Sequence, residues 1–363
     1  MCLDVFRGLL AAGMILVDNG DNSSYCAIRQ AEWNGRTPAD FIFPSFLFLV
    51  GVSMVFSYAA RLQRGESRRQ ILWHAFKRSL LLIAIGLFVN GFPLIGIDWR
   101  GFRFEGVTQR IALCYFACAL LVRSSNRRGQ IIAIAACLLG YWAILRFLPL
   151  PGFGLPAREV PFLDQNGNIA AWLDRKLFTG HLYNGNRDPE GIIHTIPAIA
   201  TTLIRVLTGG WLRSGRDRGT IAVRMLIFGI LGLVAGQVWN VWFSINKNLW
   251  TSSFTLFAGG FSLVFLALLY WILEIKQWRG AWTMPILRFG MNAIAGFVAD
   301  SFVYGPGYTW TVKGANGAAI LWHDAAQARL AALVAALIFS VASVLICWFL
   351  LWLLWRKNIF LKV

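Results

Sequence analysis

The residues best suited to chemistry surround one polar loop between the first two apolar runs. Gln30, Trp33 and Asn34 lie in this loop, Asp40 ends it, and Asp18 closes the run before it. A carboxylate can act as a general base, amides can hold a polar substrate, and an indole can stack on a sugar ring. The loop is short enough to fold back over both runs, so we expect these side chains to meet near one point.

Two of these residues also have ordinary structural explanations. A tryptophan at the end of a membrane helix is commonly an interfacial anchor, which would suffice for Trp33. An aspartate at the start of a helix commonly caps it and suits its dipole, which would suffice for Asp40. Either explanation would account for its own residue, whereas the whole cluster of polar residues favours a catalytic or binding site.

More polar residues fall at the ends of later apolar runs on the same side of the chain. They offer hydrogen-bond donors and acceptors to the same face, and one of them is an imidazole, which titrates near neutral pH. These residues are Glu190, His194, Asn246, Lys247 and Asn248.

Two arginines lie where an anion could be held. Arg7 is three residues after Asp4, so the two share a helix face and can pair, which is the structural alternative to ligand binding. Arg110 is about one turn inside an apolar run, where a charge usually faces a partner or a wet cavity, unless it snorkels to the surface. Asn292 also lies within a run, where asparagine more often joins helices than binds a ligand.

The composition predicts the elements that position these residues. The 363-residue chain is 57% hydrophobic and 14% charged, with a mean hydropathy of +0.59. Apolar runs of about 18 residues recur, as membrane spans do, and helices satisfy their own backbone groups in lipid. We therefore expect an all-α integral membrane protein, a single domain over residues 1–363 with ten transmembrane helices in one bundle. The expected spans are 3–19, 41–60, 76–92, 107–122, 131–148, 191–212, 221–243, 252–273, 285–302 and 330–355.

The charges predict an orientation. Of the 34 basic residues, 20 fall in one alternating set of connections and 10 in the other, so the positive-inside rule places both termini in the cytoplasm. Thirteen of the 17 acids lie on the outer side, where a long loop spans about 149–190. The inner face should attract anions, and the outer face should suit sugars or amines. Plain topology signalling is the alternative explanation for the basic side. The net charge of +17 is thus explained by topology, and no nucleic-acid partner is expected.

Templates of soluble enzymes are absent from the sequence. It has no Walker loop, no dinucleotide glycine fingerprint, no HExxH and no GxSxG elbow. The six cysteines have neither metal-ligand nor disulfide spacing, and we expect no metal centre.

A family resemblance follows from motifs along nearly the whole chain. They are "LDVFRG", "WNGRTPADFIFPSFLFLVGVS", "EGVTQRIALCY", "DPEGIIHTIPAIATTLI", "NKNLWTSSF" and "FGMNAIA". The chain resembles the heparan-α-glucosaminide N-acetyltransferase-like family of multi-span membrane acyltransferases, as a bacterial member in the inner membrane. The resemblance implies that an acetyl group passes from cytoplasmic acetyl-CoA, the expected donor, to a sugar or amino sugar on the outer side.

The resemblance also assigns roles to the candidate residues. The donor would be bound by Arg7 at the inner face and by Arg110 near its reacting end, with Lys247 and Asn292 as further contacts. The acceptor would be bound by Trp33 and Asn34. The remaining acceptor contacts expected are Glu190, Asn246 and Asn248.

The chain departs from the family pattern at the residue expected to carry or accept the acyl group. The family's histidine position holds Gln30, and an amide is neither a useful base nor a nucleophile. Direct transfer with a carboxylate base is therefore expected. Asp18 is the first candidate because the family's other polar residue stands there, Asp40 is the second and His194 the third. A transporter or flippase for an amino-sugar derivative, and a non-catalytic membrane partner, remain as alternatives. A homodimer is possible on sequence grounds.

Overall fold

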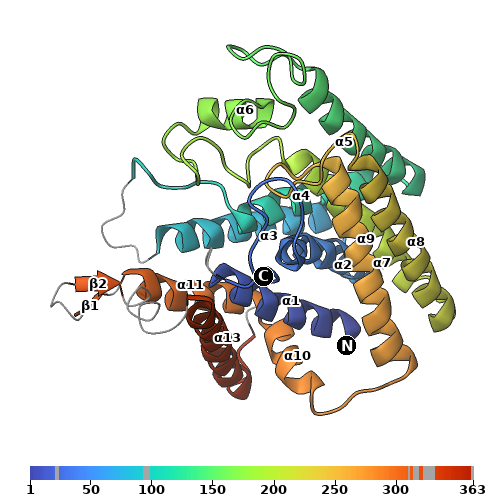
Figure 1. Cartoon of the computed structure of the whole chain (residues 1–363). Coiled ribbons are helices and arrows are strands. Elements are labelled where there is room, and N and C mark those ends of the chain that lie inside the picture. The colour runs from blue at the N-terminus through green and yellow to red at the C-terminus, as the bar shows by residue number, and fades with distance from the viewer. Residues whose placement is uncertain (21–23, 93–98, 310, 314–318, 322–331, 361–363) are drawn as a thin grey trace.

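The computed structural model describes residues 1–20, 24–92, 99–309, 311–313, 319–321 and 332–360. It consists of helices that pack side by side, with one short strand pair (Figure 1). The long helices are α1 (Cys2–Asp18), α2 (Ile42–Gln63), α3 (Arg68–Gly91), α4 (Val107–Ser124), α5 (Arg127–Phe147), α7 (Thr195–Leu212), α8 (Arg218–Trp239), α9 (Ser252–Tyr270), α11 (Ala293–Thr309) and α13 (Ala332–Arg356). The shorter elements are η1 (Pro38–Phe41), α6 (Ile169–Leu177), η2 (Trp271–Ile275), α10 (Thr283–Met291), β1 (Thr311–Lys313) and β2 (Ala319–Leu321).

The helical membrane architecture is confirmed, whereas the count of ten spans is not. Within the described residues, 8 helices are long and apolar enough to cross a membrane, or up to 9 if a bent helix pair is one span. α1 has 17 residues. The start predicted for the last span, at residue 330, lies outside the described residues. The antiparallel pair of β1 and β2 at the end of α11 was not expected for an all-α protein.

The bent pair corrects the prediction of one continuous span over 285–302. α10 and α11 meet at 87°, and Asn292 stands at the break. Its side-chain Nδ2 donates to the carbonyl of Ile359 at 3.1 Å, which ties the break to the segment after α13. Asn292 therefore joins parts of the chain, as intramembrane asparagines commonly do.

Polar contacts hold the segments that connect the helices together at both ends of the bundle. At one end, Glu274 accepts from the backbone N–H of Cys2 at 3.0 Å and pairs with Arg279 at 2.6 Å. At the other end, the loop after α1 lies against the loop between α8 and α9, where Asn34 and Asn246 form a β-bridge. The helices α8 and α9 run side by side between these ends (Figure 1).

α1 and α10 cross at a very close contact. A Cβ on Gly290 would lie 1.9 Å from the carbonyl oxygen of Asp4, and a Cβ on Gly8 would lie 1.9 Å from that of Ile286. Only residues without a side chain allow the two backbones to approach this closely. The crossing also brings the Gly290 carbonyl to Arg7, whose Nη1 donates to it at 3.2 Å.

We expect Gly290→Ala to force the two helices apart. Overpacking of this kind costs about 1–3 kcal/mol, so the apparent Tm of the purified protein should fall by several degrees. Gly140→Ala is the matched control, because a Cβ at Gly140 meets no atom within 4 Å. Equal thermal stability of the two variants would contradict the importance of this crossing.

Candidate active site

The polar loop after α1 is anchored by the residues that the sequence assigned to acceptor binding. The Nε1 of Trp33 donates to the carbonyl of Leu163 at 2.8 Å, and the guanidinium of Arg187 lies 4.8 Å from the centre of its ring. Trp33 thus joins this loop to the long segment between α5 and α7. Its indole is half-buried and also packs against the hydrophobic cluster that contains Phe243 and Leu249.

Three asparagines fasten the same loop to the α8–α9 connection. The Nδ2 of buried Asn246 donates to the Oδ1 of Asn34 at 3.1 Å, and its Oδ1 accepts from the N–H of Leu249 at 2.8 Å. Asn248 donates from Nδ2 to the carbonyl of Glu32 at 3.3 Å. These amide hydrogen bonds therefore hold the loop against the α8–α9 connection. Gln30 is an exposed residue of the same loop.

Asp40 is fully buried and acts as a cap. Its Oδ2 accepts from the N–H of Thr37 at 2.8 Å and from the N–H of Ala31 at 3.2 Å, and it completes a capping box at the start of η1. Its Oδ1 lies 3.7 Å from the Nζ of Lys247. The capping explanation of Asp40 is confirmed, and Lys247, assigned to the donor, forms an ion pair with it.

Lys247 is also subject to the charges of other acids at this end of the bundle. Burial lowers the pKa of Lys247, and the negative charges of Asp40, Glu190 and Asp18 oppose that effect. Asp40 is thus the direct ion-pair partner of Lys247, and Glu190 and Asp18 act on it only through their charge. Asp18 itself is exposed at the last position of α1, whereas Asp40 has no exposed surface.

Beside Asp18 lies a buried polar group that the sequence reasoning missed. Asn19 donates from Nδ2 to the Oδ1 of Asp300 at 2.7 Å, and Ser343 donates to the Oδ1 of Asn19 at 3.2 Å. This links α1 to α11 and α13. The signal was available, because Asp300 is an ionisable residue inside an apolar run, and such a residue commonly marks a functional site.

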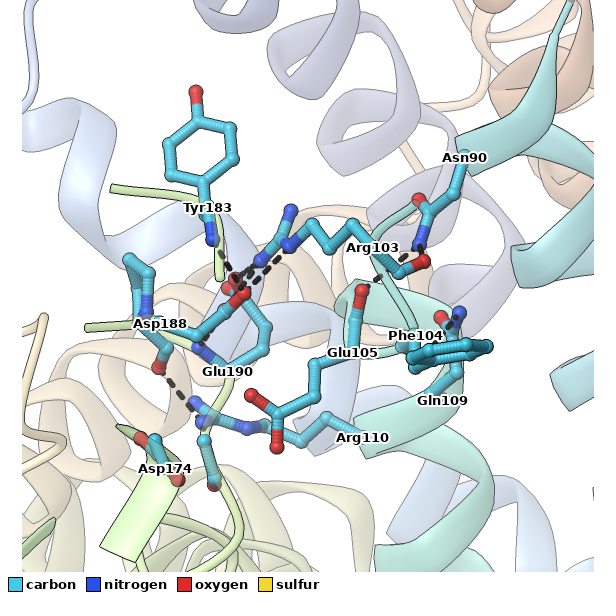
Figure 2. Close-up of polar contacts among 12 residues, drawn as sticks. Asn90, Arg103, Phe104, Glu105, Gln109, Arg110, Asp174, Tyr183, Asp188 and Glu190 are labelled. Carbon is cyan, nitrogen blue, oxygen red and sulfur yellow. Dashed lines mark hydrogen bonds and ion pairs between the residues drawn. The ribbon is translucent and has the colours of Figure 1, made fainter. Parts of the chain in front are cut away.

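An arginine-centred network holds the segment immediately before α7. Figure 2 shows the guanidinium of Arg103 meeting the carboxylates of Asp188 and Glu190, and its Nε lies 2.7 Å from the Oδ2 of Asp188. Glu190, which the sequence assigned to the acceptor, is thus engaged by Arg103. The sequence reasoning did not single out Arg103, since no local pattern relates it to acids more than 80 residues away.

Arg110 does not snorkel to the surface. It is 1% exposed, its Nη2 donates to the carbonyl of Pro189 at 2.7 Å, and its guanidinium lies 5.1 Å from the centre of the Trp250 ring. His194 is 2% exposed, and burial, followed by the charge of Arg110, lowers the pKa of its imidazole to about 3. The ring is therefore neutral at pH 7 and a weak base.

Two further buried acids face Arg110. Burial, with the nearby charges of Asp174 and Asp188, raises the pKa of Glu105 to about 9, and burial raises that of Asp174 to about 7. Figure 2 shows the side chain of Glu105 turned toward Arg110 and Asp174. Glu105 therefore holds its proton at neutral pH.

This protonation predicts a pH dependence of stability. Folded Glu105 keeps a proton that the unfolded chain releases above about pH 4.5, so its contribution to stability falls as pH rises toward about 9. His194 affects the pH dependence of stability only below its ordinary pKa of 6.5, where the unfolded chain gains a proton that the folded chain does not bind. The loss is therefore best observed between about pH 7 and about pH 9, where it should amount to about 1–3 kcal/mol.

Glu105→Gln should remove this loss, because glutamine imitates the protonated acid without titrating. Thermal unfolding followed across this pH range measures the effect. Glu159→Gln, which changes an exposed acid between α5 and α6, is the control and should retain the wild-type profile. A pH profile that is the same for wild type and Glu105→Gln would show that Glu105 is ionised.

A cavity of about 240 Å³ runs beside α1 toward the Asp18 end. Arg7 and Arg78 line it with Ser53 and Tyr115, and its other walls are largely apolar. Along α1 it extends from Arg7 to Met14, which is about 10 Å at the rise of an α-helix. Met14 is one turn before Asp18, so the lining of the cavity on α1 ends one helical turn short of that acid.

The arginines of the cavity are held differently. Arg7 donates from Nη1 to Asp4 at 3.0 Å and from Nη2 to Ser53 at 3.3 Å, so the predicted pair with Asp4 is confirmed. Arg78 lies with its guanidinium 4.8 Å from the centre of the Tyr115 ring, and its Nε has no hydrogen-bond partner among the described residues. Sequence reasoning counted Arg78 only as part of the basic face.

The fold and this geometry define a polytopic helical membrane protein with a cavity lined by two arginines and a polar cluster at the end of α1. The family model described as the catalytic part of heparan-alpha-glucosaminide N-acetyltransferase matches residues 1–157. Heparan-alpha-glucosaminide N-acetyltransferase of Mus musculus is 30% identical over 347 residues, 82% of this chain and 52% of the relative. The Homo sapiens protein of the same name is 30% identical over 367 residues, 86% of this chain and 54% of the relative.

The predicted resemblance is thereby confirmed, and the chain belongs to the heparan-α-glucosaminide N-acetyltransferase-like family. The chain spans about half the length of the curated relatives it matches.

Proposed function

We propose that this protein is a membrane acetyltransferase that transfers the acetyl group of acetyl-CoA to a sugar or amino sugar on the opposite side of a bacterial inner membrane. The observation that carries the proposal is the cavity between Arg7 and Met14. Its arginines suit the phosphates of CoA, since guanidinium groups bind phosphate in forked geometry. Its apolar walls suit a pantetheine arm that reaches toward Asp18. The names of the relatives support the acetyl group and the sugar acceptor.

The reaction is direct in this proposal. The acceptor nitrogen or oxygen attacks the thioester carbonyl, the carbon–sulfur bond breaks, CoA leaves as the thiol or thiolate, and Asp18 takes the proton of the acceptor. Asp18 is the exposed carboxylate at the end of α1, whereas Asp40 is a buried cap with an ion-pair partner. The loop amides and Trp33 supply the wall against which the acceptor would rest.

Purified protein should transfer radiolabelled acetyl groups from acetyl-CoA to members of a panel of amino sugars and sugars. The second measurement is thermal stabilisation by CoA esters, because a ligand that binds only the folded state raises its stability. No transfer and no stabilisation across the panels would refute the proposal. Flux of an amino sugar into liposomes without CoA would favour a transporter instead.

The two sides of the reaction depend on the orientation of the chain. We expect both termini in the cytoplasm, so a cysteine placed at Asn184 should react with an impermeant maleimide added outside intact cells. A cysteine placed at Gly65, in the connection between α2 and α3, should be spared. Both positions are exposed, and a Cys26→Ser background removes the exposed native cysteine of the loop after α1, so access to the reagent decides the result. If only the cysteine at position 65 is labelled, the chain has the opposite orientation, and the proposed donor and acceptor sides are exchanged.

A further inference from the structure

A fully buried arginine, which is not among the residues that line the cavity, lies inside the helix bundle. Arg205 is in the middle of α7 and has 0% exposure. Its Nη1 donates to the carbonyl of Thr201, one turn earlier in the same helix. Its Nε and Nη2 have no hydrogen-bond partner among the residues that the structure describes. One side of the guanidinium is covered by the Phe48 ring, whose centre is 4.9 Å away.

No carboxylate balances this charge within the described part of the chain. The titratable groups close enough to affect Arg205 are the thiols of Cys114 and Cys118, and a thiol is ordinarily neutral near pH 7. Arginine does not give up its proton in proteins. An isolated charge inside a membrane bundle is costly and usually faces a partner.

The Nη2 of Arg205 lies beside Gly259 of α9, at a place where an added side-chain atom would meet few neighbours. A Cβ built on buried Gly259 would have one atom within 4 Å, and that atom is the Nη2 of Arg205 at 3.9 Å. Gly259 therefore borders room for about one additional atom. Thr255 lies one turn earlier on the same face of α9, is 0% exposed, and its hydroxyl has no partner among the described residues.

We propose that Arg205, Gly259 and Thr255 form a binding site for a monatomic anion, chloride in the cell. A guanidinium supplies the charge and the N–H donors, and the threonine hydroxyl supplies a further donor. A water molecule could fill the same space but would leave the charge unbalanced. The space beside a single glycine suits one ion better than a phosphate or carboxylate group. Bound chloride would join α7 to α9 and stabilise the bundle.

The test compares thermal unfolding of the full chain in potassium chloride and in potassium gluconate at equal ionic strength. The apparent Tm of wild type should rise saturably, by a few degrees, as chloride replaces gluconate. Gly259→Ala retains Arg205 and fills the space, so this rise should disappear. Arg205→Met should also lose it. Gly140→Ala, which places the same methyl group where no atom lies within 4 Å, should keep it.

Bromide provides the direct measurement, because its anomalous scattering can be located in crystals. A peak within hydrogen-bonding distance of the Nη2 of Arg205 is expected. The proposal is overturned by an equal Tm in both salts, by a chloride dependence that Gly259→Ala retains, or by the absence of a bromide peak. If Arg205→Met does not fold, Gly259→Ala and the bromide peak still decide the matter. The outcome does not depend on whether the protein transfers acetyl groups.

Discussion

Asp18→Asn is expected to lower the rate of acetyl transfer by about 10²–10⁴-fold, which is the usual contribution of a general base. Asparagine retains the size of the side chain and its hydrogen-bonding capacity but cannot accept the proton of the acceptor. Donor binding should persist, because the cavity begins at Arg7 and Met14 is the nearest lining residue of α1. The measurements are steady-state transfer rates and CoA affinity for the same preparations.

Two variants serve as controls for this prediction. Gln30→Ala should lose much less activity, since an amide at this exposed position can at most donate a hydrogen bond. Asp40→Asn should mainly lower thermal stability, because Asp40 caps η1 and pairs with Lys247. An Asp18→Asn protein with wild-type activity would exclude Asp18 as the base.

Arg78→Ala is expected to weaken CoA binding by about 10–100-fold, the loss that corresponds to about 1.5–3 kcal/mol for hydrogen bonds to a charged group. Arg78 lines the cavity and its buried Nε has no hydrogen-bond partner within the described chain, so a phosphate in the cavity would supply the acceptor that this group lacks. Arg7→Ala should show a similar loss, accompanied by lower stability, because Arg7 also binds Asp4 and the carbonyl of Gly290. Calorimetric titration with CoA at two salt concentrations measures both effects.

Arg123→Ala is the matched control, since Arg123 is an exposed basic residue near the end of α4. The salt dependence of CoA affinity should decrease for Arg78→Ala and remain unchanged for Arg123→Ala. If Arg7→Ala and Arg78→Ala both keep the wild-type CoA affinity and its salt dependence, the cavity is not the binding site of CoA.

The features that depend on neighbouring residues could be predicted from the sequence. Apolar runs gave the helices, because each helix satisfies its own backbone and needs only length and hydropathy. The pair of Asp4 with Arg7 follows from a spacing of three residues on one helix face. The cap at Asp40 follows from the preference of aspartate for the first turn. Family membership came from motifs that lie in order along the chain.

Contacts between distant segments were decided only by the tertiary structure. Asn34 and Asn246 are 212 positions apart, and Asn19 and Asp300 are 281 apart, so no local pattern relates them. Several residues that the sequence assigned to ligands bind one another in the structure, as Asn34 binds Asn246 and Asp40 pairs with Lys247, and their roles in a site stay predictions. The break at Asn292 and the arginines that line the cavity likewise depend on which helix faces pack together. Sequence periodicity specifies that a face is buried, whereas packing of the whole bundle determines what it is buried against.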